Sequence, residues 1–512
     1  MEKTFTEADI KYIKGRGNSL EKVQQQLDFF IKGIPKINLV RSATIGDGIW
    51  RFSDEEITSF VNYFDKHRNL YVTEKFIPAS GAATRMFKFL NEFLNEFDEE
   101  SDTINSYVNK KKAKDISIFI FGLKNFPFYR ELKEKTTSLF PNYYSLSNDK
   151  QYYLLIETLL SEKGLNFAQK PKGILPFHVK GDNIVTPIEE NIFEADFFKK
   201  KDYKTKIHFT ITKEFQVDFK KITNQFSDYE INFSYQEQST DTLAVNEDNT
   251  PFRIEDNTLF FRPGGHGALI ENLNTLQSDI IYIKNIDNVS QNYTDVIAIY
   301  KKLLGGVLIR MQFQIFEYLK KMSEGNVTED EIIEIRNFTE NKTAFPLPEE
   351  FNFFKSTYKI EYLIKVLNRP IRVCGMVKNE GEPGGGPFWV QDKKGRLTLQ
   401  IVESSQIDLN NKTQKSIAKE ATHFNPVDIV CGIKNFKGEK FDLTQFIDQN
   451  TAFITEKTKH GKTIKVFELP GLWNGAMAKW TTIFVEVPLI TFNPVKTVND
   501  LLKASHQPVN NG

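Results

Sequence analysis

A chain of 512 residues exceeds the usual size of a single-core domain, so we expect one large enzyme-like core with appended pieces, or two to three domains. Lysine plus arginine equals aspartate plus glutamate at 67 each, which argues against a general nucleic-acid-binding role and leaves only local charged patches. The N-terminus MEKTFT lacks an apolar signal core, and no run reaches the roughly 18 apolar residues of a membrane helix. We therefore expect a soluble, cytoplasmic protein that contacts neither nucleic acid nor membrane.

The two cysteines, Cys374 and Cys431, are too few for a fold built on disulfides. No zinc-ligand spacing can be made from them. Both are expected to be small buried residues.

Residues 1–75 form a predicted N-terminal helical region. Ser53 with Glu56 three positions later is a capping-box pattern, and it precedes the apolar run ITSFVNYF. This pattern predicts a helix that begins just after Ser53.

The segment FIPASGAATRM, residues 76–86, is an apolar strand that runs into a turn of small residues before a helical pattern. Small side chains let the backbone approach an anion, and free N–H groups at a helix start, with Arg85 as the nearby cation, balance its charge. The pattern is consistent with a phosphate-binding turn. Many ordinary strand-to-helix connections are also built from small residues for packing reasons, so both interpretations stay open at this point.

Strand-like and helical runs alternate over residues 76–370, which predicts an α/β core. The expected strands are Ile207–Ile211, Ile231–Tyr235, Leu259–Phe261 and Ile280–Ile283, with helices near 214–227 and 266–277 and a long helical stretch after residue 290. Residues 87–169 read as a helical insertion.

Residues 371–512 are expected to be a strand-rich part that completes the core. Its predicted strands are Ile371–Met376, Phe388–Gln391 and Leu397–Val402. The Gly/Pro-rich piece Glu380–Trp389 is a loop by composition, either a ligand loop or a wide turn.

Three further segments suit an anionic ligand. KPKGILPF, residues 170–177, holds Lys172 on a backbone restricted by proline, and RPGGHGAL, residues 262–269, is a second close-approach turn that opens a helix. DIIYIKNIDNV, residues 279–289, is an apolar strand that presents Asp287 at its C-terminal end, where α/β sheets place ligands and where a carboxylate suits magnesium. Taken singly, Lys172 reads as a surface lysine and Asp287 as a helix cap, and only their order in the chain favours a site.

With these segments the chain resembles the sugar-1-phosphate nucleotidylyltransferases, most closely the UDP-sugar and UDP-N-acetylhexosamine pyrophosphorylases. ASGAATRM is similar to their glycine-rich GGxGTR loop, PKGILPF to their PKG segment, RPGGHGAL to their PGGxG turn and NIDN to the strand end with their metal-binding aspartate. Later, VESSQI resembles their VEYSEI strand, THFNPVDIV their FN segment and FNPVKTVNDLL their FxPVK stretch followed by DLL. The whole chain is also similar to the uncharacterised bacterial family named domain of unknown function 4301.

The resemblance implies an α/β fold with a glycosyltransferase-A-like mixed sheet flanked by helices, preceded by N-terminal helices and carrying a helical insertion. It implies that Arg85, Lys172 and Lys496 are the catalytic cations that hold the triphosphate and the sugar phosphate. Mg²⁺ would be the cofactor. The implied nucleotide-binding residues are Ser80, Gly81, Thr84, Gln238, Gly265 and Gly267, and the implied metal ligands are Asp287 and Asp428; Gln236 fits almost as well as Gln238.

Two departures from the family pattern stand out. Ser80 and Ala83 replace loop glycines, and a long helical insertion separates Arg85 from Lys172 where the family has a short loop. The added Cβ atoms limit how closely the backbone approaches an anion.

The implied activity joins a nucleoside triphosphate, expected to be UTP, to a sugar 1-phosphate and releases pyrophosphate. Two alternatives stay open: a catalytically inactive nucleotide-binding or regulatory protein, and a sugar transferase that uses a nucleotide sugar. The sugar, the base and the oligomeric state are left open by the sequence.

Overall fold

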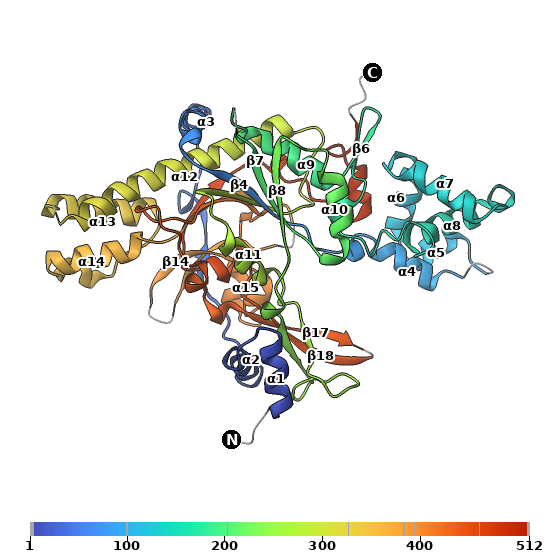
Figure 1. Ribbon diagram of the computed structural model, residues 1–512, viewed down its shortest axis with the longest axis horizontal. Coiled ribbons are helices and arrows are strands. Elements are labelled where there is room, and N and C mark those ends of the chain that lie inside the picture. Colours follow the sequence, from blue (N-terminus) through green and yellow to red (C-terminus); the bar gives the residue numbers. More distant parts are fainter. Residues whose placement is uncertain are drawn as a thin grey trace. The chain divides into compact units, whose positions relative to one another are not determined.

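The computed structural model describes residues 5–98, 101–201, 203–325, 327–381, 384–392, 395–459 and 461–508. Its contacts divide the chain into two compact units, each made of several segments. Unit 1 comprises residues 1–76, 234–283 and 301–489, and unit 2 comprises residues 77–233, 284–300 and 490–512. Figure 1 shows the elements of both units in the colours of the chain.

Unit 1 holds most of the strands. Its helices are α1 (Glu7–Gly15), α2 (Leu20–Lys32), α3 (Asp54–His67), α11 (Leu269–Thr275), α13 (Glu329–Lys342), α14 (Ser356–Leu367), α15 (Lys412–Lys419) and most of α12 (Thr294–Ser323). Its strands are β1 (Asn38–Ser42), β2 (Thr44–Ile45), β3 (Gly48–Trp50), β9 (Thr242–Val245), β10 (Phe261–Arg262), β12 (Ile371–Lys378), β13 (Gly386–Gln391), β14 (Leu397–Val402), β15 (His423–Phe424), β16 (Asp428–Gly432), β17 (Phe453–Lys459), β18 (Lys462–Glu468) and β19 (Thr481–Glu486), with most of β4 (Thr73–Pro78) and β11 (Ile280–Lys284).

The main sheet of unit 1 has the strand order β2-β3-β19-β12-β16-β11-β4. The pairs β3/β19, β12/β19 and β4/β11 are parallel and the pair β12/β16 is antiparallel, so the sheet is mixed. Strands β11 and β16 are buried along their whole length, because helices and loops cover both faces of such a sheet. The expected α/β class with a mixed sheet is confirmed.

Two smaller sheets complete unit 1. One has the order β1-β13-β14 and the other β10-β9-β18-β17. Helices α1 and α2 cover the second sheet, with Ile13, Val23 and Leu27 buried beside Leu243 and Phe467. Helices α13 and α14 pack against each other (Figure 1).

Unit 2 is mainly helical. Its helices are α4 (Lys88–Glu96), α5 (Ile104–Lys111), α6 (Lys114–Gly122), α7 (Tyr129–Leu139), α8 (Asn148–Leu160), α9 (Pro187–Glu194) and α10 (Gln216–Thr223), and its strands are β5 (His178–Lys180), β6 (Asn183–Val185), β7 (Thr205–Thr210) and β8 (Tyr229–Ser234). Strand β4 ends in this unit, where β7 and β8 follow it in the sheet order.

The predicted helical insertion is present as helices α4–α8. These helices share one apolar core that includes Phe93, Phe119, Phe128 and Leu159. Val495, Val498 and Leu501 of the C-terminal segment belong to the same core. The insertion therefore packs on the stretch that carries the FNPVK motif.

Several sequence predictions match the elements closely. Helix α3 begins after Ser53 with both capping-box hydrogen bonds in place, and β12, β13 and β14 occupy the three strands expected after residue 370. Cys374 and Cys431 are buried and free, as expected.

The N-terminal region is less purely helical than its sequence indicated. Strands β1, β2 and β3 lie between α2 and α3, and such short strands leave too few residues for an alternating pattern to show. The expected loop Glu380–Trp389 also gives way to strand β13 at Gly386; Glu382 and Pro383 lie outside the described residues.

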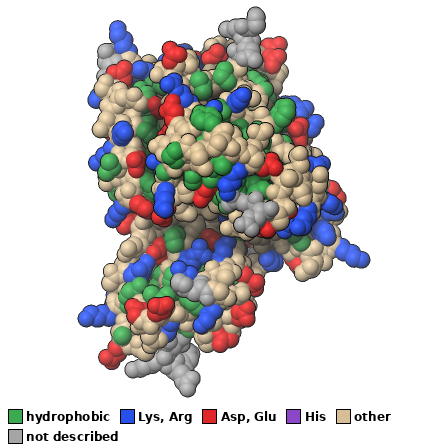
Figure 2. All heavy atoms as spheres, turned by 90° about the vertical axis from the view of Figure 1, so that its right-hand side faces the viewer, with side chains coloured by type: hydrophobic (Ala, Val, Ile, Leu, Met, Phe, Trp, Pro, Cys, Tyr) green, Lys and Arg blue, Asp and Glu red, His purple; other side chains and the backbone are tan. Residues whose placement is uncertain are grey.

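Figure 2 shows lysine and arginine side chains interspersed with aspartate and glutamate on the face in view, in keeping with the balanced charge of the chain. In the part of the chain that the structure describes, no helix combines the length and apolar character needed to cross a bilayer.

Candidate anion-binding site

The turn after β4 is hydrogen-bonded to the PKG segment within unit 2. Ala83 N–H donates to the Lys170 carbonyl at 2.9 Å, and Lys172 N–H donates to the Gly81 carbonyl at 3.2 Å. This pair of bonds forms an antiparallel bridge between Ala82 and Pro171. Two motifs separated by the whole helical insertion are therefore neighbours.

The NIDN and FNPVK motifs are joined in the same way. Asn288 forms an antiparallel bridge with Pro494, and its Oδ1 accepts the N–H of Asn493 at 2.8 Å. Val495 N–H donates to the Asp287 carbonyl at 3.1 Å. Both motifs lie in unit 2.

The side chain of Lys172 connects these two pairs of motifs. Its Nζ lies 2.8 Å from Asp287 Oδ2 and 2.8 Å from the Val495 carbonyl oxygen. The side chains of Lys172 and Asp287 are only 15% and 19% exposed, so this ion pair is shielded from water more than a surface pair. One ammonium thus binds the strand end and the C-terminal motif together.

The turn itself presents backbone donors to solvent. The N–H groups of Gly81 and Ala82 donate to no acceptor among the described residues, and both residues are exposed. A Cβ built at Gly81 would meet nothing within 4 Å, and Gly81 does not adopt a positive φ. Neither packing nor conformation demands a glycine here, and the open backbone suits the close approach of an anion.

Arg85 and Thr84 follow in the short 3₁₀ turn Ala83–Arg85 before helix α4. Arg85 is exposed and has no ion-pair partner among the residues that the structure describes. Thr84 is exposed as well, and its Oγ1 donates to the Ala168 carbonyl at 3.1 Å. Ser80 is half-buried beside them.

Lys496 is exposed, and its Nζ lies 5.7 Å from the centre of the Phe492 ring. Its backbone N–H donates to Asp500 Oδ2 at 2.9 Å, and the same carboxylate caps the 3₁₀ turn Val498–Leu502 through Thr497. The backbone that carries Lys496 is thus fixed while its ammonium faces solvent.

Of the two residues that replace loop glycines, Ala83 has a structural reason to be there. Ala83 is fully buried, and it packs in the core of the helical insertion. Its N–H is also used by the Lys170 carbonyl, so this position is not available to a ligand.

Asp287 fits the donor chemistry that magnesium prefers, since a carboxylate is a hard oxygen ligand. Among the described residues there is no cluster of three His, Cys, Asp or Glu side chains that could hold a metal ion. Mg²⁺ is commonly held by one or two carboxylates together with substrate phosphates, so a single carboxylate beside an anion-binding turn is compatible with it.

Gly265 and Gly267 belong to unit 1, and both glycines are required by the chain's own packing. Gly265 has φ +76°, and a Cβ there would meet the carboxylate of Glu468. A Cβ at Gly267 would lie 2.3 Å from the Pro470 carbonyl oxygen. Between them His266 stacks on Trp473 with ring centres 4.3 Å apart, and burial lowers the pKa of His266.

The two glutamines that the sequence could not separate differ in environment within unit 1. Gln238 is exposed, and its carbonyl accepts Asn18 Nδ2 at 3.4 Å. Gln236 is half-buried, and its Nε2 is a buried donor with no partner among the described residues. The choice between the two glutamines as a nucleotide-binding residue stays a prediction.

Asp428 lies in the interior of unit 1 at the start of β16. It is 2% exposed, and its carboxylate forms an ion pair with the fully buried ammonium of Lys301 on α12. The carboxylate is therefore paired within unit 1, and its role as a metal ligand stays a prediction.

Sequence reasoning did not single out Asn288. It is 1% exposed, and its Nδ2 has no partner among the described residues although its Oδ1 is bonded to Asn493. The only signal in the sequence is that an asparagine follows Asp287 in NIDN and another stands in FNPVK.

The fold and these contacts define an α/β protein in which four of the sequence motifs form a loop cluster within one compact unit. The chain belongs to the family described as domain of unknown function (DUF4301), whose model matches residues 6–507. No curated protein matches the chain in sequence.

Among solved structures, a UDP-N-acetylglucosamine pyrophosphorylase from Trypanosoma brucei in complex with an inhibitor is similar with a TM-score of 0.48 and 10% identity, over 97% of this chain and 79% of that chain. A UDP-glucose pyrophosphorylase from Leishmania major in complex with UDP-glucose gives 0.43 and 13%, over 97% and 77%. A protein from Entamoeba histolytica described as a UDP-N-acetylglucosamine pyrophosphorylase gives 0.39 and 9%, over 86% and 79%. Likeness at this level carries no information on activity.

Proposed function

We propose that this protein is a sugar-1-phosphate nucleotidylyltransferase that joins a nucleoside triphosphate, expected to be UTP, to a sugar 1-phosphate and releases pyrophosphate. The observation that supports it most is the Lys172 ammonium, which contacts both Asp287 and the Val495 carbonyl and so links the NIDN and FNPVK loops. Four of the motifs that resemble those of the nucleotidylyltransferases, ASGAATRM, PKGILPF, NIDN and FNPVK, thus lie within unit 2.

The reaction is an in-line attack by a sugar-phosphate oxygen on the α-phosphorus, and it needs no nucleophilic side chain. Both substrates are highly anionic, so this chain's task is to hold them in line and to balance their charge. Correct positioning of two reactants lowers a barrier by roughly 7 to 11 kcal/mol. In this proposal Arg85 and Lys172 hold the triphosphate, and Lys496 holds the sugar phosphate.

The open N–H groups of Gly81 and Ala82 add neutral donors to these cations. Asp287 would hold Mg²⁺, which when bound neutralises charge on the phosphate oxygens. The choice of UTP and a sugar phosphate rests on the motif resemblance alone.

A nucleotide-binding protein without chemistry is the second candidate. Two observations favour it: the N–H of Ala83 is already used within the protein, and Asp428 is already paired with Lys301. Both leave fewer groups that could stabilise the charge of a transition state.

A screen of nucleoside triphosphates against sugar 1-phosphates with Mg²⁺, read out as pyrophosphate and nucleotide sugar, separates the candidates. Formation of both products supports the proposal. Nucleotide binding without pyrophosphate with any pair supports the second candidate. In a parallel incubation with a nucleotide sugar, its consumption without any need for pyrophosphate supports a sugar transferase.

A further inference from the structure

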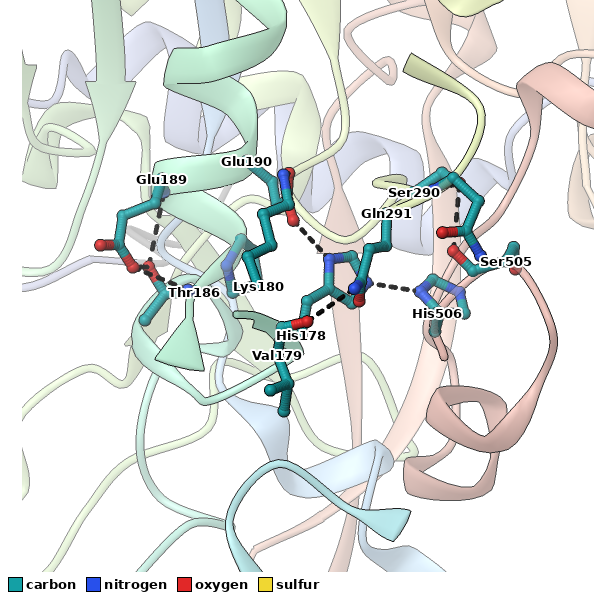
Figure 3. Close-up of polar contacts among 12 residues, drawn as sticks. His178, Val179, Lys180, Thr186, Glu189, Glu190, Ser290, Gln291, Ser505 and His506 are labelled. Carbon is teal, nitrogen blue, oxygen red and sulfur yellow. Dashed lines mark hydrogen bonds and ion pairs between the residues drawn. The ribbon is translucent and has the colours of Figure 1, made fainter. Parts of the chain in front are cut away.

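A network of hydrogen-bonded polar side chains is buried in unit 2 (Figure 3). His178 Nδ1 lies 2.6 Å from Glu190 Oε1, and His178 Nε2 lies 2.8 Å from His506 Nδ1. Lys180 Nζ contacts the other oxygen of Glu190 at 2.7 Å. His178, Glu190 and His506 are at most 3% exposed.

The hydrogen bonds of this network have a defined direction. With Glu190 ionised, His178 Nδ1 must carry a proton and donate it to the carboxylate. His506 then exchanges one hydrogen bond with His178 Nε2, while its own Nε2 is a buried atom with no partner among the described residues. Burial, then the neighbouring His178, lowers the pKa of His506 to about 3, and the backbone of Asn493 in the FNPVK motif acts in the opposite sense.

The backbone around His506 is hydrogen-bonded to the loop that follows Asp287. Gln291 N–H donates to the Ser505 carbonyl at 2.9 Å, and Ser290 Oγ donates to the same oxygen at 3.1 Å. Asn292 Nδ2 donates to the carbonyl of Ala504 at 2.6 Å and to that of Gln507 at 3.0 Å.

The same loop is also hydrogen-bonded to strand β5, which follows the PKG segment. Gln291 Nε2 donates to the Val179 carbonyl on β5 at 2.6 Å, as Figure 3 shows. His178 and Val179 come shortly after Lys172, Ser290 and Gln291 shortly after Asp287, and Ser505 and His506 shortly after Lys496. Each segment of this network therefore follows, in sequence, one of the motifs of the candidate site.

Stability alone does not explain why a polar network is buried here. Well-packed apolar residues of similar volume are often as stabilising as a buried ion pair, whereas directional hydrogen bonds fix one register among several packings. Here the bonds fix three loops whose relative placement decides where the cations of the site lie.

We propose that His506 is a positioning residue, and that residues 504–507 form a C-terminal latch which holds the 285–292 loop and β5 in the register that the anion-binding site requires. The latch is a property of unit 2 whether or not the chain is a nucleotidylyltransferase. Only its effect on ligand affinity rests on the proposed function.

The test compares variants of the full chain. His506→Asn keeps an amide near the position of Nδ1, whereas His506→Gln places the amide near the position of Nε2 and His506→Ala removes it. His208→Asn is the matched control, because His208 is a buried histidine on β7 in the same unit. The first readout is amide hydrogen exchange without ligand, and the second is the affinity for inorganic pyrophosphate with Mg²⁺.

We expect His506→Ala and His506→Gln to speed exchange at least tenfold in peptides covering 285–292 and 172–180, with peptides of α4–α8 unchanged. Both should weaken pyrophosphate binding at least tenfold, and His506→Asn should stay within about threefold of the unsubstituted chain in both readouts.

Unchanged exchange at 285–292 in the folded Gln variant would overturn the latch. An Asn variant no better than Gln, or the same changes in His208→Asn, would overturn it too. If the exchange pattern is as expected while the unsubstituted chain binds no pyrophosphate, the latch stands and the proposed function falls.

Discussion

The ammonium of Lys172 lies 2.8 Å from Asp287 Oδ2, and the two side chains come from motifs that the sequence separates widely. The ammonium can donate three hydrogen bonds and accept none, and a second N–H donates to the Val495 carbonyl oxygen. Because the pair is mostly shielded from water, its loss would disturb the loops on both sides. The pair is thus the structural centre of the candidate site.

Lys496→Ala should lower turnover at least about a hundredfold, because it removes a cation that would balance charge as the reaction proceeds. The fold should be unaffected, since the side chain of Lys496 is exposed and its contact with the Phe492 ring is at the surface, while its backbone N–H keeps the bond to Asp500. Steady-state kinetics beside a thermal melt measure both. Lys88→Ala serves as the control, since Lys88 is an exposed lysine of the same unit; unchanged turnover in the Lys496 variant would exclude this role.

Gly81→Ala should weaken nucleotide binding about tenfold, or about 1.4 kcal/mol, because the added methyl group occupies the space through which an anion reaches the turn. Stability should not change, since a Cβ at this position meets nothing within 4 Å. Calorimetric titration with UTP and Mg²⁺ gives the affinity. The control is Gly15→Ala, where a Cβ also meets nothing; equal affinities in the two variants would show that the turn is not a cradle.

Lys301→Met should lower the free energy of unfolding by about 3–5 kcal/mol, because it leaves the buried Asp428 carboxylate without a counter-charge. Adding Asp428→Asn should restore much of this loss. Urea denaturation of the single and double variants measures the coupling. If the single substitution has no effect, Asp428 does not depend on Lys301 and is free for another partner.

The stability of the chain should fall as the pH drops below 6.5. The folded pKa of His506 is about 3 against an ordinary value of 6.5, so the unfolded chain takes up the proton first and the loss continues down to about pH 3. Between pH 6.5 and 5 this amounts to about 2 kcal/mol. The groups that act on His506 are His178 on β5 and, in its own segment, Asp500 and Lys503; Glu190 and Lys180 lie behind His178.

His506→Asn should remove this contribution. Urea denaturation at pH 7.5 and pH 5 should then show a smaller difference in the variant than in the unsubstituted chain. Burial lowers the pKa of His208 to about 4, and His208 contributes equally to the pH dependence of the variant and of the unsubstituted chain. The same pH dependence in both chains would mean that His506 is not the group responsible.

Much of the fold could be predicted because its signals are local. The capping box at Ser53 and Glu56 fixed the start of α3, and the apolar run at Ile280–Ile283 matched β11. Strands β1–β3 could not be predicted, since two to five residues carry no readable period.

The candidate site was predictable only in its parts. The motif residues Lys172, Asp287 and Lys496 could be named from the sequence, but the bridge from Lys172 to Val495 depends on how distant loops pack. The partner of Asp428 is Lys301, on a helix far away in the chain, and no spacing signals it. His178, Glu190 and His506 likewise share no motif.

The most direct test of the proposed function is pyrophosphate release by the full chain with Mg²⁺ across nucleoside triphosphates and sugar 1-phosphates, repeated with Asp287→Ala. We predict that at least one pair yields pyrophosphate and nucleotide sugar in equal amounts, and that Asp287→Ala abolishes both products. No pyrophosphate with any pair, or equal release by Asp287→Ala, would contradict the proposal.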